Sequence, residues 1–386
     1  MTVSSSTRPV SALADLVDAV SQLEGLTRQV GAFALGAAAV DRAPELVAAV
    51  CGALEVPLRF DAPGDGPDHA VTALASRIRR AQRAPELARL TSAEAAATAR
   101  RIRDEGRAGL REHAVRRPDG TVLTAVAAGP PAAPCVLISA PPGLDHRLSL
   151  PWLRALGGDL HCAVLETRGT SEPITDPEDF DRRGTGLDSQ AEDLLAVAAE
   201  LAGGAVHLMG LCGGVAVALQ AAAARPDLVG SVSAWHADLE LGADVPKSDQ
   251  QENLRAVLDV AGESRDTAAW LRGRLTSGPM TGVPEEVGPL VVRPYATPEL
   301  FYRYARLTTA GMRQDSRRAA AALAGRRCLV VTSEDDATTH PAGSRRLAEL
   351  VPGARLVTSP HGSGTHLDAF RASAEHVSCL RSFLAG

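Results

Sequence analysis

The chain has 386 residues, of which 45% are hydrophobic and 22% are charged, so it is long enough and apolar enough to fold around a large core. Its net charge of −6 argues against nucleic acid as the main partner. The first residues lack a cationic segment followed by an apolar run, and no uninterrupted apolar stretch reaches about 18 residues; we therefore expect a cytoplasmic protein with no membrane contact.

The region 1–112 has the apolar spacing of helices, with hydrophobic residues three and four positions apart. We expect helices over 12–26, 43–54, 69–82 and 92–113, with a break in the Gly- and Pro-rich stretch 59–68. Thr91 followed by Glu94 is a capping-box pattern, which predicts a helix start near residue 91.

From His113 the pattern changes to that of strands, with Asp119-Gly120 as a turn between two extended runs. Four short apolar runs follow, at 135–140, 161–166, 205–210 and 228–235, and amphipathic helices at 188–202 and 214–226 lie among them. Apolar strands that alternate with helices indicate a mostly parallel central sheet with helices on both faces. The fold class is therefore α/β.

The sheet pattern is interrupted over about 240–325, where three helical segments occur without a clear strand. Strand patterns return at 326–336 and 354–360, and 366–384 forms a closing helix. We predict a helical N-terminal region, 1–112, followed by an α/β domain, 113–386, in which 240–325 is a helical cap. Trp270 and Tyr304 are among the aromatic residues that either line this cap or form its own core.

A glycine-rich turn, Gly210-Leu211-Cys212-Gly213-Gly214, lies directly after a strand and directly before a helix. This is the context of the G-x-nucleophile-x-G elbow, in which small neighbours allow a sharp turn that projects the central side chain. Cys212 is then the candidate nucleophile, and the Gly213 amide would face a developing oxyanion. The alternative is that Cys212 is simply a small buried residue in a strand-to-helix turn.

The acid and the histidine of a nucleophilic site should follow the elbow in chain order. Asp335 and Asp336 stand at the end of the strand after the cap, and we select Asp336, with Asp238 as a second choice because it follows the preceding strand. The histidine is expected after the last strand, where His366 is preferred and His361 is in reserve. Thr365 and Asp368 form a capping pattern that would make His366 the first helical residue.

A second oxyanion donor is expected from the loop after the first core strand, residues 139–146. Pro141 and Pro142 have no N–H to donate, so Gly143 is the first candidate and Leu144 the next. No cofactor or metal is expected: no nucleotide or flavin motif occurs, no two of the ten histidines have metal-ligand spacing, and the six cysteines form no CxxC pair.

Residues 113–386 resemble the α/β-hydrolase superfamily. The resemblance covers "VLISAPPG", "LETRGTSEP" (similar to the D-x-R-G-x-G-x-S turn), the elbow, "ARPDLVGSV", "SEDDATTHP" and the terminal histidine segment. Two departures stand out: cysteine replaces the usual serine, and Pro-Pro replaces the His-Gly of many relatives after the first strand. "SGTHLDAF" is similar to the "GHDAF" of the homoserine acetyltransferase branch, with an extra leucine.

A cysteine elbow preceded by a long N-terminal region also resembles the thioesterase-like aminoacyltransferases of nonribosomal peptide pathways. That resemblance implies transfer of an acyl or aminoacyl group between phosphopantetheine arms of carrier proteins in natural-product biosynthesis. Carrier proteins of this type are typically acidic, so the arginine runs at 77–83, 100–103 and 317–320 either dock them or are solvated helix faces. A substrate amino group would need a carboxylate, for which Asp145, Asp238 and Glu240 are candidates.

The leading hypothesis is thus an acyltransferase with a Cys212 thioester intermediate, which His366 and Asp336 would activate. A cysteine-dependent thioesterase or a hydrolase of the dienelactone type is the second hypothesis. The third is a catalytically silent α/β-hydrolase scaffold that binds a ligand.

Overall fold

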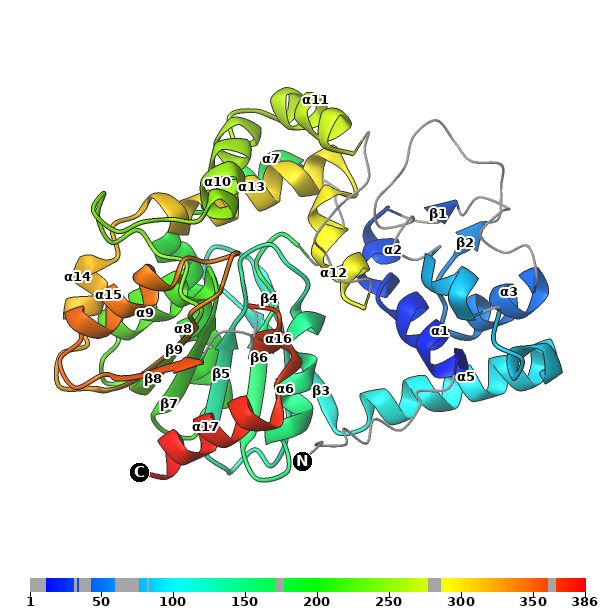
Figure 1. Ribbon diagram of the computed structural model, residues 1–386, viewed down its shortest axis with the longest axis horizontal. Coiled ribbons are helices and arrows are strands. Elements are labelled where there is room, and N and C mark those ends of the chain that lie inside the picture. The colour runs from blue at the N-terminus through cyan, green and yellow to red at the C-terminus, as the bar shows by residue number, and fades with distance from the viewer. Residues whose placement is uncertain are drawn as a thin grey trace. The chain divides into compact units, whose positions relative to one another are not determined.

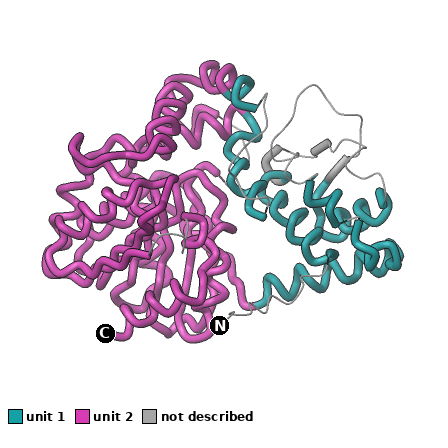
Figure 2. The backbone as a smooth tube through the Cα atoms, in the orientation of Figure 1, with its two compact units in different colours: residues 1–108, 272–297 teal, residues 109–271, 298–386 magenta. Residues whose placement is uncertain are grey.

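The computed structural model describes residues 12–30, 33–34, 43–59, 76–81, 83–170, 177–276, 286–359 and 366–386. The chain divides into two compact units, which Figure 2 shows in different colours. The first comprises residues 1–108 and 272–297, and the second comprises residues 109–271 and 298–386.

The first unit is mainly helical. Its elements are α1 (Ala12–Ser21), α2 (Glu24–Val30), β1 (Phe33–Ala34), α3 (Pro44–Ala53), β2 (Leu58–Arg59), a helical stretch at 76–81, the 3₁₀ turn η2 (Leu87–Arg89), α5 (Ser92–Arg107), α12 (Gly288–Val292) and η4 (Arg293–Tyr295). Arg77 is buried and binds Asp15 and Asp18 at 2.6 and 2.9 Å, and it also donates to the carbonyl of Glu286. These bonds attach the segment 286–297 to the N-terminal helices.

The capping box at Thr91 is confirmed, because the Thr91 hydroxyl accepts from the Glu94 amide and the Glu94 carboxylate accepts from the Thr91 amide. The helix it starts was predicted to reach His113, which is wrong: α5 ends at Arg107. Gly109, with φ +78°, turns the chain out of the helix, and a strand begins at Leu110. The short parallel pair β1–β2 was not predicted.

The second unit is built on an eight-stranded sheet in the order β10-β9-β8-β7-β5-β6-β4-β3. Only β4 runs antiparallel to its two neighbours; the other pairs are parallel. The strands are β3 (Leu110–Arg116), β4 (Val122–Ala128), β5 (Cys135–Ser139), β6 (His161–Leu165), β7 (Val206–Leu211), β8 (Val229–Trp235), β9 (Arg327–Ser333) and β10 (Arg355–Ser359). The ends of these strands lie within a residue or two of the predicted runs, with two exceptions: β3 starts three residues early, and β9 ends three residues before the end of the predicted run 326–336.

Helices cover both faces of this sheet (Figure 1). The main apolar core lies between the sheet and one helical layer, formed by α8 (Leu187–Leu201), α9 (Gly214–Ala224), α14 (Arg317–Ala321) and α15 (Pro341–Leu350). The opposite layer contains η3 (His146–Ser149), α6 (Leu150–Leu156), α16 (Asp368–Arg371) and α17 (Ala374–Ala385). There Trp152 of α6 and His376 of α17 pack edge-on against Trp235 of β8.

The remaining helices of the second unit lie at the carboxyl ends of the strands: α7 (Pro177–Arg182), α10 (Asp249–Ala261) and α13 (Pro298–Arg313). Helix α11 (Arg265–Leu275) passes from this unit into the first unit after Leu271. Two predicted continuous helices are broken. The segment 298–324 divides into α13 and α14, because the backbone amide of Ser316 donates to the backbone carbonyl of Glu240 and not to the preceding helical turn. The segment 366–384 divides at Ala372, which has φ +50°, and Ser373 caps α17.

The two units differ from the predicted regions in one respect. Residues 272–297, inside the predicted cap 240–325, group with residues 1–108 rather than with the sheet. The boundary after the N-terminal helices falls at 108/109, near the predicted 112/113. No helix among the described residues is long and apolar enough to cross a membrane.

Candidate active site

Cys212 stands at the turn between β7 and α9, in a conformation that non-glycine residues seldom adopt, with φ +52°. Two glycines make the turn possible by allowing close backbone approach. A Cβ on Gly210 would lie 2.6 Å from the Val215 Cα, and one on Gly214 would lie 2.0 Å from the Ser139 carbonyl oxygen. The residue pattern thus gives a strand-to-helix turn with a partly exposed thiol at its tip.

The elbow is fixed by the neighbouring strand. The Cys212 amide donates to the Trp235 carbonyl at 2.9 Å, and the Asp238 amide donates to the Cys212 carbonyl at 3.4 Å. The Gly213 amide has no acceptor among the described residues, and the only atom within 4 Å of a Cβ built on Gly213 would be Cδ of Pro142, at 3.5 Å. The position of Gly213 is compatible with its predicted role as an oxyanion donor.

Asp336 is buried at the end of the turn that follows β9, whereas Asp335 is exposed and bonds to Ser333. One Asp336 oxygen, Oδ1, accepts the amides of Thr338 and Thr339 at 2.9 Å each. Burial alone would raise the pKa of Asp336, but hydrogen bonds and the nearby imidazolium hold that pKa well below its usual range. Asp336 is therefore ionised, and it is the better placed of the two adjacent acids.

His366 is brought to the same place from the C-terminal segment. Its Nδ1 lies 3.6 Å from Oδ2 of Asp336 and 3.3 Å from the Thr339 hydroxyl, which in turn lies 3.9 Å from the Cys212 sulfur. Burial would lower the pKa of His366, but the charge of the Cys212 sulfur and the bond to Asp336 raise it to about 10. The arrangement therefore places a protonated imidazole close to the Cys212 side chain, with the Thr339 hydroxyl between them.

The local structure around His366 differs from the prediction. His366 is not the first helical residue, because α16 begins at Asp368 with Leu367 as its N-cap. Thr365 and the reserve histidine His361 lie outside the described residues. His366 is instead held by its surroundings, with its ring packed against those of Phe370 and His236.

Sequence reasoning missed His236, which directly follows β8. Its Nδ1 lies 2.6 Å from Oδ2 of Asp336, closer than His366 does, and its backbone has φ +50°. Its position in the sequence could have indicated it. His236 directly follows β8, the neighbour of β7, and functional side chains gather at the carboxyl ends of parallel strands. Thr339 was also missed, since a threonine in a loop carries no distinctive pattern.

His236, Asp336 and His366 form a compact set whose potential ligand atoms lie within 4.8 Å of one another. Two imidazoles and a carboxylate are donors that suit zinc or iron. However, the 2.6 Å contact between His236 and Asp336 is a hydrogen-bond distance, so these two side chains bind each other directly. We assign the group no metal.

The predicted second oxyanion donors already have partners. The Gly143 amide donates to the Thr167 hydroxyl at 3.2 Å, and the Leu144 amide donates to the Pro141 carbonyl at 3.2 Å. A Cβ on Gly143 would lie 2.6 Å from the Tyr304 ring, so this cap residue packs onto the loop. For Gly143 to act as predicted, its amide would have to leave Thr167.

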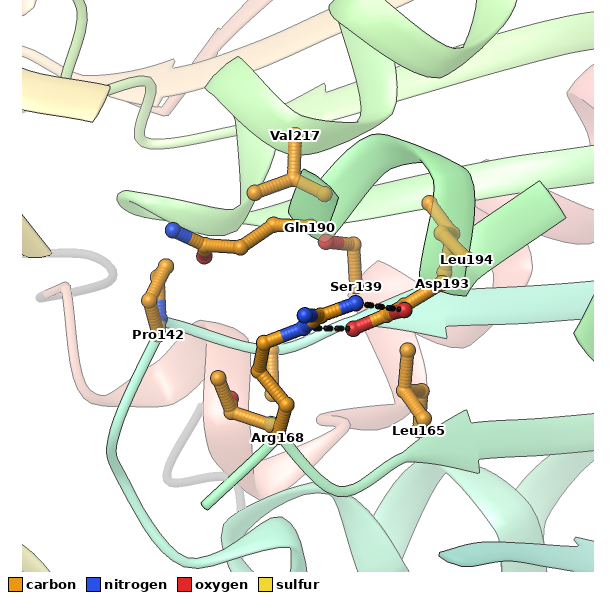
Figure 3. A pocket seen from close by; sticks show the side chains of 10 residues that line it. Ser139, Pro142, Leu165, Arg168, Gln190, Asp193, Leu194 and Val217 are labelled. Carbon is orange, nitrogen blue, oxygen red and sulfur yellow. Dashed lines mark hydrogen bonds and ion pairs between the residues drawn. The ribbon is translucent and has the colours of Figure 1, made fainter. Parts of the chain in front are cut away.

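A buried ion pair lines a pocket next to this loop, as Figure 3 shows. Arg168 and Asp193 are almost fully buried and bind each other with two hydrogen bonds. They line a small pocket of about 20 Å³ together with Ser139, Pro142 and Gln190, room for about one water molecule. The pocket is too small for a substrate and serves as part of the scaffold.

Helix α10 is attached through Gln251 to the loop after β9 that carries Asp336. The side-chain oxygen of Gln251 accepts the backbone amides of Ser248 and His340 at 3.0 and 2.9 Å, and its side-chain NH₂ group donates to Oδ1 of Asp238 at 2.6 Å. Asp238 therefore does not contact His366 as a triad acid would. It is a partly exposed residue whose backbone amide donates to the Cys212 carbonyl.

The other cysteines do not resemble Cys212. Burial raises the pKa of Cys135 to about 11 and that of Cys51 and Cys328 to about 12. It also raises the pKa of Cys162 and Cys379. These thiols stay protonated at neutral pH.

No protein-family model matches the chain, and neither does any curated protein sequence. Solved structures do match. An enol-lactonase from Burkholderia xenovorans LB400 is 21% identical, with a TM-score of 0.54, over 72% of this chain and 100% of that one. The chain has the α/β-hydrolase fold. A membrane phospholipase A described as a bacterial virulence factor (18% identical, TM-score 0.57) aligns over 74% of this chain and 90% of its own.

An esterase from Rhodococcus sp. ECU1013 gives a similar result, with 19% identity and a TM-score of 0.54 over 72% of this chain and 99% of that one. The fold expected from the sequence is thus confirmed. Cys212 lies between β7 and α9, Asp336 follows β9 and His366 follows β10, so the three predicted site residues occur in the expected chain order.

Proposed function

We propose that the protein is an acyltransferase that moves an acyl or aminoacyl group between phosphopantetheine thiols through a thioester on Cys212. The observation that carries the proposal is the nucleophile: a thiol on a strained elbow, beside an imidazole whose pKa is raised to about 10. Asp336 orients that imidazole, and the Gly213 amide is the first oxyanion donor.

Transfer would proceed in two matching halves. The Cys212 thiolate attacks the thioester carbonyl of the donor, a new S–C bond forms, and the tetrahedral oxyanion collapses as the pantetheine sulfur leaves with the proton of His366. In the second half the incoming thiol gives its proton to His366 and attacks the Cys212 thioester. The enzyme regains its thiolate and imidazolium, so atoms and charge balance.

Cysteine favours transfer over hydrolysis for an energetic reason. Exchange of one thioester for another is nearly thermoneutral, so the acyl group stays activated on Cys212. A serine ester would lose much of that activation. Water must also be kept from the thioester intermediate. Helix α10 is one cap element at this end of the sheet, and Gln251 bonds it to the loop after β9 and to Asp238.

Among the candidate carboxylates for a substrate amino group, Asp238 is the best placed. Asp145 is fully buried and binds Arg147 through both oxygens, and Glu240 pairs with Arg255. Asp238 is partly exposed, and only its Oδ1 has a partner among the described residues. An aminoacyl group on Cys212 would therefore find its counter-charge at Asp238.

The proposed partners are acidic carrier proteins. Of the three arginine runs considered for docking, the one at 77–83 is weakened because Arg77 points inward and is neutralised by two aspartates. In the run 317–320, Arg317 pairs with Asp315. In the run 100–103, Arg101 and Arg103 pair with acids of α5, and Arg103 also lies 3.9 Å from Glu55, just after α3, yet Arg101 is well exposed.

Intact-protein mass spectrometry tests the proposal. The protein is incubated with a panel of acyl- and aminoacyl-pantetheine thioesters, and a holo carrier protein is then added. We expect an adduct on Cys212 that disappears mainly as the carrier gains the same mass. Cys212→Ala should carry no adduct, and continued labelling of this variant at another residue would refute the assignment of the nucleophile.

Cys212→Ser is the matched control for the role of sulfur. It keeps a nucleophilic oxygen at the elbow but forms an oxygen ester, so any adduct should pass to a carrier thiol much more slowly than from wild type. Equal transfer rates would remove the argument from thioester energetics.

A cysteine-dependent thioesterase or lactone hydrolase is the second candidate. It is favoured by the fold match to proteins described as an enol-lactonase and an esterase. In that case the wild-type adduct decays as fast in buffer as with carrier present. A silent scaffold would form no adduct with any donor.

A further inference from the structure

Asp336 has two histidine neighbours, although a catalytic triad needs only one. Oδ1 is occupied by two backbone amides, so Oδ2 alone faces the imidazoles. His236 Nδ1 lies 2.6 Å from Oδ2, and His366 Nδ1 lies 3.6 Å from the same atom. The two rings therefore compete for one carboxylate oxygen.

We propose that His236 is a positioning residue that donates its Nδ1–H to Asp336 and thereby limits how strongly Asp336 holds the His366 imidazolium. The inference rests on the proposed role of His366 as the acid–base group. Its physical basis is that a carboxylate oxygen already accepting a short hydrogen bond is a weaker acceptor for a second donor.

The charges around His236 indicate which ring carries the extra proton. Burial lowers the pKa of His236 more than its bond to Asp336 raises it, and the positive charge of His366 lowers it further. His366, beside the Cys212 sulfur, has its pKa raised to about 10. His236 is thus neutral with its proton on Nδ1, and His366 is the imidazolium.

The backbone supports a specific role for His236. Its φ of +50° is unfavourable for a residue with a side chain, and its side chain is almost fully buried. Its amide bonds to the Val331 carbonyl of β9 at 2.8 Å, which fixes the ring over the turn that carries Asp336. Strain of this kind persists where the surrounding structure holds it, and such positions cluster at functional sites.

The consequence for catalysis concerns the departing thiol. The imidazolium must give up its proton to the leaving sulfur, so an acid that is held too tightly is a poor donor. By occupying Oδ2, His236 weakens the hydrogen bond between Asp336 and the His366 imidazolium. Without it, the pKa of His366 should rise by about half to one unit, since only part of the effect of a lost charged hydrogen bond reaches the second ring.

The test uses the full chain in a Cys212→Ser background, in which the sulfur charge is absent and His366 titrates in an accessible range. Imidazole resonances are followed by NMR against pH, with His366 assigned from its loss in His366→Gln. We expect His236→Ala to raise the pKa of His366. His236→Asn should restore it, because asparagine offers an N–H and tolerates positive φ.

His207→Asn is the matched control. His207 is another buried histidine of the sheet, bonded to Ser231 and Ser233, and has no contact with Asp336. The His207→Asn variant should leave the pKa of His366 unchanged. An unchanged pKa in folded His236→Ala would overturn the proposal. Because this readout needs no substrate, it stands or falls separately from acyl transfer.

The wild-type protein provides a second test if His236→Ala does not fold. Nitrogen-15 shifts of the His236 ring report which nitrogen carries the proton. A neutral ring protonated at Nδ1 supports the proposal. A ring protonated only at Nε2, or a charged His236 beside a neutral His366, overturns it.

Discussion

Gly214→Ala should destabilise the second unit strongly, because the elbow brings α9 against the end of β5. The added Cβ would lie 2.0 Å from the Ser139 carbonyl oxygen and 2.7 Å from that of Ala140. Since real Cβ contacts are essentially never under 3.0 Å, helix and strand must separate by 3.0 − 2.0 = 1.0 Å. Such overpacking against backbone should cost about 3 kcal/mol, a fall in Tm of roughly 6–12 °C for a unit of this size.

The assay is urea and thermal unfolding, together with the rate at which iodoacetamide alkylates Cys212. Gly213→Ala is the matched control, because its Cβ would meet only Pro142, at an ordinary 3.5 Å, and its φ of −59° suits alanine. We expect that variant to change the free energy of unfolding by less than about 1 kcal/mol. Equal stability of the two variants would refute this steric account of the elbow.

Other substitutions test the remaining parts of the site. Arg168→Met should lower the free energy of unfolding by about 3 kcal/mol, because the buried Asp193 loses the partner that binds it with two hydrogen bonds and keeps only the 3.1 Å contact with Arg117. Arg168→Met combined with Asp193→Leu should recover part of this loss in urea titrations, and no recovery would contradict the ion-pair explanation. Cys212→Ser should lower the pKa of His366 from about 10 towards its ordinary value of 6.5. A raised folded-state pKa adds stability that is present below 6.5 and is lost as pH rises through about 10. The unfolding free energy should therefore fall less over that range in Cys212→Ser than in wild type, and an equal fall would argue against the Cys212 sulfur as a cause of the raised pKa of His366. Asp238→Asn should lower kcat/KM about tenfold for an aminoacyl thioester but not for the matching acyl thioester without the amino group; an equal loss for both would remove its role in specificity.

Much of the fold could be predicted because local patterns and tertiary structure agree. The apolar runs of β5–β9 are buried on both faces, so their composition marks them. The Thr91 capping box is a local hydrogen-bond pattern, and it holds in the structure. Gly210 and Gly214 of the elbow likewise stand where backbone approach excludes any side chain.

What could not be predicted depends on long-range contacts. The break between α13 and α14 follows from the bond of Ser316 to Glu240, 76 positions away in the sequence, 316 − 240. The contact of His236 with Asp336 joins the ends of two neighbouring strands across 100 positions. Spacing in the sequence carries no trace of such a contact, although the end of each strand could be located.

The grouping of residues 272–297 with the N-terminal helices affects the order in which the protein folds during synthesis. Protein domains usually fold one after another as they leave the ribosome. Here Arg77 and Gln22 must wait for the carbonyl of Glu286, by which time α8, α9 and strands β3–β8 have been made. The unit that begins the chain therefore cannot be completed first, and deletion of residues 1–108 would strip residues 272–297 of their partners instead of removing a self-contained module.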